Sequence, residues 1–408
     1  MKKVAIIGAG AAGLSAAVVL GREGFSVDVF EQNAKPAKKI AVSGNGHCNI
    51  TNRNISPANY TTHNPEFVEK VLKRFGYKEL EKFLQSIGIL LFAKSDGKCY
   101  PLSYEAKSVI KAYEETLKEL GVNFFYDKRI DSIEKTENYT LLCKEEKFEG
   151  YDEVIVASGL KAAPQLGGND DALRFASAFG HNIIEPYPAL VGLHTDSSYN
   201  EMLSGVKIHG EATLYIDRLK EKNVQGDILF TAYGVSGLAV LDISQGASLA
   251  LSYAQDVQIS LNLLHGQNPQ SLTSQLTNLC KALPEHTFAT LLGSIVPHKL
   301  ALCVLQQSSL ENSLKASQVN PKIIKGVMNQ LTNYRLHITD THGYKHAEVC
   351  GGGVDTTEID VKSFESKKLQ GLYFVGELLD ITGERGGYNF QFAFASGILC
   401  AQHIAKSH

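Results

Sequence analysis

Three glycines near the N-terminus have the spacing of a nucleotide-binding turn. Gly8, Gly10 and Gly13 form a G-x-G-x-x-G sequence directly after an apolar run at residues 4–7. In such a turn the first glycine permits a tight bend, the second lets a pyrophosphate approach the backbone, and the third brings the next helix close to the sheet. The free N–H groups and the positive dipole end of that helix favour phosphate. The spacing therefore predicts a dinucleotide site.

An acidic residue further along the chain strengthens this prediction. Residues 14–22 are rich in Ala and Leu and indicate a helix, and residues 25–30 alternate as a second strand that ends at Glu31. A carboxylate about 20 residues beyond the glycine turn is the usual partner of the ribose hydroxyls. The order strand, turn, helix, strand indicates a Rossmann-type domain, but it does not separate NAD from FAD.

A second group of motifs lies near the C-terminus. An apolar strand is expected at 372–375, and the sequence 386–391 then precedes a helix over 392–405 that is apolar on all sides and is therefore expected to be buried. FAD enzymes of the glutathione-reductase type bring such a distant segment back to the flavin, whereas NAD dehydrogenases usually complete their nucleotide domain in one contiguous segment. The alternative for the glycine pair in this segment is an ordinary helix N-terminus.

A third segment fits the same arrangement. Residues 151–159 end in Ala-Ser-Gly and resemble the strand and small-residue turn that passes beside FAD in that superfamily. Because the turn has no bulky side chain, its backbone is able to approach a cofactor. Together the three segments favour FAD.

The sequence at residues 38–52 makes the resemblance specific. It reads K-K-I-A-V-S-G-N-G-H-C-N-I-T-N, while 347–354 reads A-E-V-C-G-G-G-V and 376–391 reads G-E-L-L-D-I-T-G-E-R-G-G-Y-N-F-Q. These motifs are similar to those of the bacterial NAD(P)/FAD-dependent flavoprotein family that includes aminoacetone oxidase and the bile-acid-inducible 3-dehydro-bile-acid reductase. The resemblance spans nearly the whole chain. Glu384 and Arg385 depart from it, since relatives often have apolar residues there, and this difference bears on substrate preference.

The resemblance and the residue patterns together imply a domain organisation. The alternation at 206–217 and 257–263 predicts antiparallel strands, and the leucines between 272 and 283 share one helical face. We expect an α/β fold in which a Rossmann-like, glutathione-reductase-like FAD-binding domain carries an inserted antiparallel β domain and a helical cap. The expected boundaries are 1–190 and 346–408 for the FAD-binding domain, 191–264 and 333–345 for the β-rich domain, and 265–332 for the cap.

The candidate cofactor-binding residues come from six parts of the chain. Small residues let the backbone approach a flat ring, and amides offer partners for flavin carbonyls, ribityl hydroxyls or phosphate. For Cys48 a buried unreactive thiol is the default, and covalent or redox participation is the alternative. The candidates are Gly8, Gly10, Ala11, Ala12, Gly13, Glu31, Gln32, Asn33, Lys39, Ser43, Gly44, Asn45, Gly46, Cys48, Asn49, Asn52, Ile130, Ala157, Ser158, Gly159, Gly376, Glu377, Asp380, Gly386, Gly387, Tyr388, Asn389, Phe390 and Gln391.

The expected activity is that of an FAD-dependent oxidoreductase that transfers a hydride through flavin N5. No second G-x-G-x-x-G is present, so NAD(P)H is expected to visit only transiently as a co-substrate. We favour a reductase of an unsaturated carbonyl or similar small molecule. The alternatives are a dioxygen-using amine or aminoketone oxidase and, in another class, a non-catalytic flavin-bearing binding protein. No catalytic acid or base is assigned, because Glu377, Tyr388 and His47 are equally explained as cofactor contacts or packing.

Composition excludes several classes of protein function. The 408 residues carry a net charge of −3 and are 44% apolar, which suggests two to three domains and argues against a nucleic-acid partner. No apolar stretch is long enough for a membrane helix, the seven cysteines contain no C-x-x-C, and we expect a cytoplasmic protein. His342 and His346 have i, i+4 spacing, but Gly343 lies between them and no acid completes a set, so no metal site is predicted. The oligomeric state is not predicted.

Overall fold

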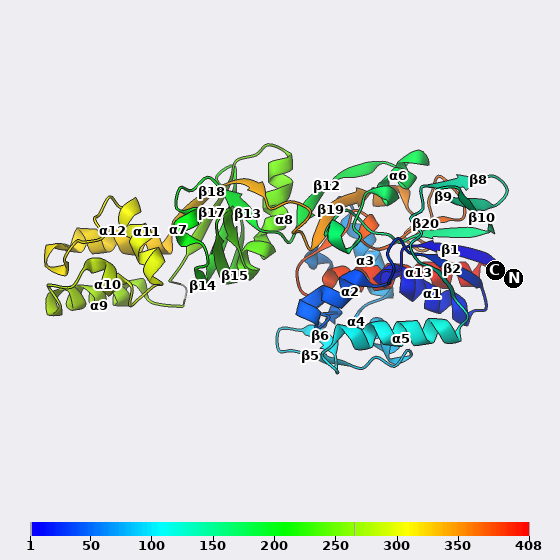
Figure 1. Cartoon of the computed structure of the whole chain (residues 1–408), viewed down its shortest axis with the longest axis horizontal. Coiled ribbons are helices and arrows are strands. Elements are labelled where there is room, and N and C mark those ends of the chain that lie inside the picture. Colours follow the sequence, from blue (N-terminus) through cyan, green and yellow to red (C-terminus); the bar gives the residue numbers. More distant parts are fainter. Residues whose placement is uncertain (1, 265, 408) are drawn as a thin grey trace. The chain divides into compact units, whose positions relative to one another are not determined.

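The computed structural model describes residues 2–264 and 266–407. The chain folds into two compact units (Figure 1). The first unit combines the chain up to Tyr187 with the chain from Glu348 onward, and the second unit runs from Pro188 to Ala347. No helix in the described ranges is long and apolar enough to cross a membrane.

A five-stranded parallel sheet organises the first unit. Its strand order places the strand from the C-terminal segment beside the strand at 153–156, which in turn pairs with the N-terminal strand. The two ends of the chain therefore meet in one sheet, which confirms the predicted Rossmann-like fold. In spatial order the strands are β20 (Leu372–Phe374), β11 (Glu153–Val156), β1 (Lys3–Ile7), β2 (Ser26–Phe30) and β7 (Asn123–Phe125).

Two helices from opposite ends of the chain pack together beside this sheet. They are α1 (Ala11–Arg22) and α13 (Tyr388–Lys406), and Figure 1 shows both next to β1 and β2. Most of their side chains are buried, which agrees with a helix that is apolar on all sides. The other helices of the unit are α2 (Lys38–Val42), α3 (Pro65–Arg74), α4 (Tyr77–Gln85), α5 (Ala106–Glu119) and α6 (Asp171–Ala178).

Four smaller sheets of short strands complete the strands of the first unit, and the first three of them are antiparallel. Their strand orders are β3-β6-β5, β10-β9-β8, β21-β4 and β12-β19. The strands are β3 (Thr51–Asn52), β4 (Tyr60–Thr61), β5 (Leu91–Ala93), β6 (Lys98–Pro101), β8 (Ser132–Lys135), β9 (Tyr139–Cys143), β10 (Glu146–Tyr151), β12 (Ile183–Ala189, which ends across the unit boundary), β19 (Val349–Val354) and β21 (Thr382–Gly383).

The second unit contains a closed antiparallel barrel, where the sequence predicts a β-rich insertion. Its order is β13-β16-β15-β14-β17-β18, so no strand edge is left open. The strands are β13 (Leu193–Thr195), β14 (Lys207–Ile216), β15 (Leu219–Thr231), β16 (Gly234–Ser236), β17 (Val257–Asn262) and β18 (Tyr334–Thr341). The helices are α7 (Asn200–Leu203), α8 (Leu238–Ser252), α9 (Pro269–Ala282), α10 (Phe288–Leu292), α11 (His298–Gln307) and α12 (Pro321–Thr332).

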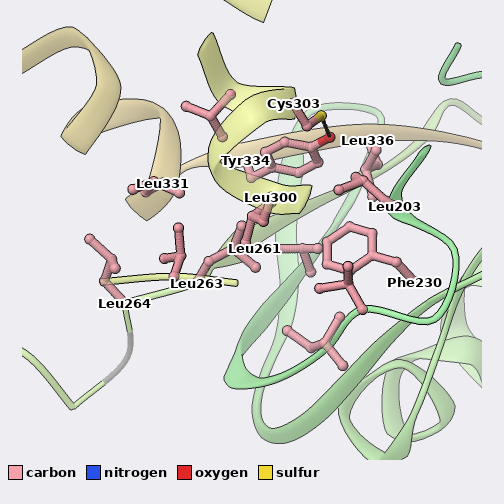
Figure 2. Packing of buried hydrophobic residues seen from close by; sticks show 14 of the residues in the cluster. Leu203, Phe230, Leu261, Leu263, Leu264, Leu300, Cys303, Leu331, Tyr334 and Leu336 are labelled. Carbon is pink, nitrogen blue, oxygen red and sulfur yellow. Dashed lines mark hydrogen bonds between the residues drawn. The ribbon is translucent and has the colours of Figure 1, made fainter. Parts of the chain in front are cut away.

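One hydrophobic core joins the barrel to these helices. Barrel residues such as Phe230 and Leu261 pack with Leu300 of α11 and Leu331 of α12, and all four are at most 2% exposed (Figure 2). Within this core the hydroxyl of Tyr334 meets the Cys303 thiol at 3.5 Å. A shared core of this kind makes the helices and the barrel depend on each other for stability.

Candidate functional site

The glycine turn between β1 and α1 is packed tightly at two of its three glycines. Gly8 has φ +105°, and a Cβ there would lie 2.7 Å from the Cα of Ser158. A Cβ on Gly13 would overlap the carbonyl oxygen of Gly8. At Gly10, by contrast, an added Cβ would meet no described atom within 4 Å. The fold itself therefore requires Gly8 and Gly13, whereas Gly10 borders open space of the kind a pyrophosphate needs.

Glu31 lies at this turn, as its spacing predicts. The side chain is buried, and its Oε2 accepts a hydrogen bond from the Ala9 N–H at 3.0 Å. Its Oε1 accepts two further hydrogen bonds from the backbone and side-chain nitrogens of Asn33, at 2.8 and 2.7 Å. A carboxylate has about four acceptor positions, so one position remains for a ligand hydroxyl.

Four chain segments converge at the Glu377 carboxylate. It forms an ion pair with Lys39 at 2.7 Å and accepts the backbone N–H of Cys350 at 3.0 Å. Gly159 approaches so closely, with φ +70°, that a Cβ there would lie 3.3 Å from Glu377 Oε2. The structure thus brings together three predicted site residues, together with Cys350, which lies in a quoted motif but was not predicted as a site residue.

The segment from Ser43 to Asn49 has an unusual backbone. Gly44, Asn45 and Cys48 have φ values of 56°, 55° and 58°, in the left-handed region that non-glycine residues seldom adopt. Such conformations cluster at ligand-binding sites. Burial raises the pKa of the Cys48 thiol to about 11, although a hydrogen bond with Ser43 opposes this shift. The thiol is therefore protonated at neutral pH, which favours the default of an unreactive buried cysteine.

The N-terminal end of α13 packs against β3 and is hydrogen-bonded to it. Gly387 has φ +97°, and a Cβ there would lie 2.6 Å from the carbonyl of Thr51. The Thr51 hydroxyl donates to the Gln391 side chain at 2.7 Å, and the Asn52 amide donates to the carbonyl of Gly386 at 3.3 Å. Residues 51–52 and 386–391 consequently form one structural element, even though they are more than 300 positions apart.

Several other predicted residues form hydrogen bonds within the protein or are buried in its core. Asn389 binds the backbone of Gly383 through both amide atoms, at 2.7 and 2.8 Å. Gln32 bonds the carbonyl of Gly167 and accepts from Asn169. The Ile130 side chain is buried and brings no polar group. Ala11 and Ala12 are buried in the first turn of α1, and Ala157 is buried directly after β11. Gly376 packs against Ala12, since a Cβ on Gly376 would lie 3.1 Å from the Cβ of Ala12.

Asp380 has a partner, His63, that no sequence pattern indicates. The carboxylate is buried and accepts from both the backbone N–H and the Nδ1 of His63, each at 2.9 Å. Of the residues considered as a catalytic acid or base, Glu377 is paired with Lys39, and the other two lie as follows. Tyr388 is buried, which raises the pKa of its hydroxyl, and its neighbour Phe390 faces Phe394. His47 stacks on Tyr104 with ring centroids 3.9 Å apart.

Two buried polar atoms test whether these residues suit a dinucleotide. The Oγ of Ser158 and the Oδ1 of Asn49 are buried and have no hydrogen-bond partner among the described residues. Buried polar groups in native proteins nearly always have a partner. Ser158 packs against Gly8, and Asn49 packs against Gly44. With the open space at Gly10, these two atoms fit a ligand rich in donors and acceptors, as FAD is.

The parallel strand order, the glycine turn and the returning C-terminal segment define a Rossmann-type FAD-binding oxidoreductase. Residues 2–403 match the family described as HI0933-like protein Rossmann domain. The chain belongs to this family, which confirms the resemblance found in the motifs.

Relatives with curated names cover the full chain. The 3-dehydro-bile acid delta(4,6)-reductase of Clostridium scindens is 32% identical over 410 residues, with 100% of both chains covered. The ribosomal RNA dihydrouridine synthase of Haemophilus influenzae is 31% identical over 410 residues, with 98% of both covered. Among solved structures, 3-ketosteroid delta1-dehydrogenase from Sterolibacterium denitrificans aligns over 100% of both chains with a TM-score of 0.54 at 13% identity. At that identity the likeness shows the fold alone.

Proposed function

We propose that this protein is an NAD(P)H-linked, FAD-dependent reductase of a carbon–carbon double bond conjugated to a carbonyl. The observation that carries the proposal is the full-length relationship to the delta(4,6)-reductase of C. scindens. The dihydrouridine synthase points to the same chemistry, because uridine becomes dihydrouridine when two hydrogens add to a double bond next to a carbonyl. Bound FAD would supply the hydride-transfer chemistry that amino-acid side chains lack.

The residues of the first unit divide the binding of FAD between them. We assign the pyrophosphate to the backbone N–H groups at Gly10 and the start of α1, where the helix dipole favours negative charge. The free acceptor position of Glu31 suits a ribose hydroxyl. The unpartnered atoms of Asn49 and Ser158 suit the donors and acceptors of the remaining cofactor.

The ion pair of Lys39 with Glu377 has a positioning role in this scheme. The ammonium lies 2.7 Å from the carboxylate, and both side chains are partly shielded from water. The same carboxylate holds the backbone of Cys350, so Lys39 is fixed relative to β19. A fixed positive charge beside the cofactor would stabilise negative charge that develops on reduction.

Anaerobic mixing of the yellow holoprotein with NADH or NADPH tests the proposal. We expect one of the two nucleotides to bleach the flavin and a conjugated enone to restore the colour. If neither nucleotide bleaches it but an aminoketone does, the protein is an oxidase and the reductase proposal is wrong. A flavin that no donor reduces would indicate a non-catalytic binding protein.

Uridine in RNA is a second candidate substrate. Two curated relatives, from H. influenzae and Escherichia coli, are named ribosomal RNA dihydrouridine synthase and are each 31% identical to this chain. The net charge of −3 argues against RNA, but residues 266–332 contain five lysines and only two acidic residues. A locally basic region of this kind suits a phosphate backbone. Incubation of ribosomal RNA with the enzyme and NAD(P)H, followed by mass spectrometry for a gain of two hydrogens, distinguishes this substrate from a free enone.

A further inference from the structure

Four rings gather on neighbouring parts of the barrel in the second unit. Tyr233 lies in the turn between β15 and β16, His194 lies in β13, and His342 and His346 follow β18. The rings of Tyr233 and His342 are stacked, with centroids 3.7 Å apart and planes 10° apart. The ring of His346 continues the stack on His342, at 4.1 Å and 28°. We call these four side chains the ring column.

The backbone holds the ring column in place. The N–H of His342 donates to the carbonyl of Gly192 at 2.8 Å, and the carbonyl of Tyr233 accepts the N–H of Thr195 at 3.1 Å. The imidazoles of His194 and His342 share a hydrogen bond of 2.9 Å between Nε2 and Nδ1. A Cβ at position 192 would lie 2.5 Å from the Tyr233 hydroxyl oxygen, so any residue other than glycine there would force the tyrosine side chain to shift. The stack is therefore formed in advance of any ligand.

The outer end of the ring column is open. His346 is exposed to solvent, whereas His194, Tyr233 and His342 are half-buried. His346 is thus the solvent-exposed member of the stack that it forms with His342. Burial, together with the neighbouring His346 and His194, lowers the pKa of His342. The lowered pKa favours the neutral form of the His342 imidazole, which offers one donor and one acceptor nitrogen.

We propose that the ring column binds a ring with a planar conjugated carbonyl group, which stacks on His346. Such a group is present both in a free cyclic enone, over its O=C–C=C atoms, and in the flat uracil of a nucleotide, and both have carbonyl oxygens that accept hydrogen bonds. Aromatic stacking selects for flatness, and a saturated ring is puckered and loses most of this contact. The inference rests on the proposed function and narrows its substrate to planar cyclic carbonyl compounds.

Binding measurements on the FAD-loaded protein test the inference. The probes are 4-androstene-3,17-dione and uridine, and their matched controls are the saturated 5α-androstane-3,17-dione and 5,6-dihydrouridine. Removal of a stacking ring weakens the binding of a flat ring by roughly 5- to 150-fold. We expect His346→Ala to weaken one unsaturated probe by at least about 5-fold in calorimetric titration, while its saturated control changes by less than about 2-fold. The probe that responds identifies the source of the ring.

Two further variants separate stacking from other effects. His346→Phe keeps a flat ring and should bind the responsive probe within about 2-fold of the native protein. His337→Ala removes an imidazole of β18 that lies outside the column and pairs with Asp196, and it should leave binding unchanged. Unchanged binding in His346→Ala, equal loss in His346→Phe, or no binding of either unsaturated probe to the native protein would overturn the inference.

The outcome for the inference is separate from the outcome for the proposed function. If an enone reoxidises the reduced flavin but His346→Ala binds it normally, the reductase stands and the ring column is not its binding site. If His346→Ala loses binding of a flat ring that never reoxidises the flavin, the ring column is a binding site and the reductase proposal fails.

Discussion

Replacement of Gly10 by alanine should remove FAD and leave the fold intact. Gly10 is the N-cap of α1 with φ −88° and ψ −169°, a conformation that alanine adopts without strain, and the new Cβ would meet no described atom within 4 Å. Alanine is a poorer N-cap than glycine by about 1 kcal/mol, but it loses less backbone entropy on folding, which offsets about 0.4–1 kcal/mol. The free energy of unfolding of the apoprotein should therefore change by less than about 1 kcal/mol, and Tm by less than about 4 °C.

The effect on FAD binding should be much larger. A methyl group in the space assigned to the pyrophosphate acts like overpacking, which costs about 1–3 kcal/mol and corresponds to roughly 5- to 150-fold in Kd. The assay is titration of the apoprotein with FAD, followed by quenching of flavin fluorescence, beside a thermal melt of the same sample. Gly13→Ala is the matched control, because its Cβ would overlap the carbonyl oxygen of Gly8 and should destabilise the fold itself. If Gly10→Ala binds FAD with the native Kd, the assignment of the pyrophosphate is wrong.

Three further predictions concern packing, thiol reactivity and pH. Gly387→Ala should lower the free energy of unfolding by about 2–5 kcal/mol, because it combines a positive φ with backbone overlap at Thr51. Gly343→Ala, with φ +74° but no atom within 4 Å of the new Cβ, should lower it by only about 1–2 kcal/mol. Urea unfolding measures both values, and equal losses would contradict this prediction. Because the pKa of Cys48 is about 11, iodoacetamide at pH 8 should label it on the order of a hundredfold more slowly than an unfolded cysteine, and rapid labelling seen by peptide mass spectrometry would refute this. Burial lowers the pKa of His181 below its ordinary 6.5, so the unfolded chain binds the proton more tightly; the stabilisation is present above pH 6.5 and declines as the pH falls below it. His181→Gln should flatten the dependence of unfolding free energy on pH between 7.5 and 5.5, and an unchanged slope would count against this mechanism.

The sequence predicts those parts of the site that depend on local sterics. Gly8 and Gly13 are recognisable because a tight turn between a parallel strand and a helix admits few other residues there, and the structure shows the close backbone contacts that explain both. The apolar run at 372–375 is recognisable as a buried strand, and it forms β20 beside β11. The FAD contacts of the individual residues stay predictions.

Individual side-chain contacts between distant segments were not predicted. The hydrogen bonds between His63 and Asp380 join positions 317 residues apart, and neither residue has a local pattern that indicates the other. The helix α8 (Leu238–Ser252) was missed because it is buried against the barrel on several sides and carries no marked amphipathic stripe. Such a helix is stabilised mainly by tertiary packing, and its sequence lacks the periodic pattern by which a helix is recognised.

The ring column is another set of side-chain contacts, here at a candidate binding site, that the sequence pattern does not predict. The i, i+4 spacing of His342 and His346 led to no predicted site, because Gly343 lies between them and no acid completes a metal-binding set, but in the structure their rings stack on each other. Tyr233 enters the stack from a hairpin more than 100 residues earlier, so one-dimensional spacing carries no information about the contact. The stack depends on Gly192, where any side chain would displace the tyrosine ring. Gly192 is confined by the Tyr233 side chain rather than by backbone. Gly192→Ala therefore tests the whole ring column, because a single added methyl group would push against the tyrosine ring.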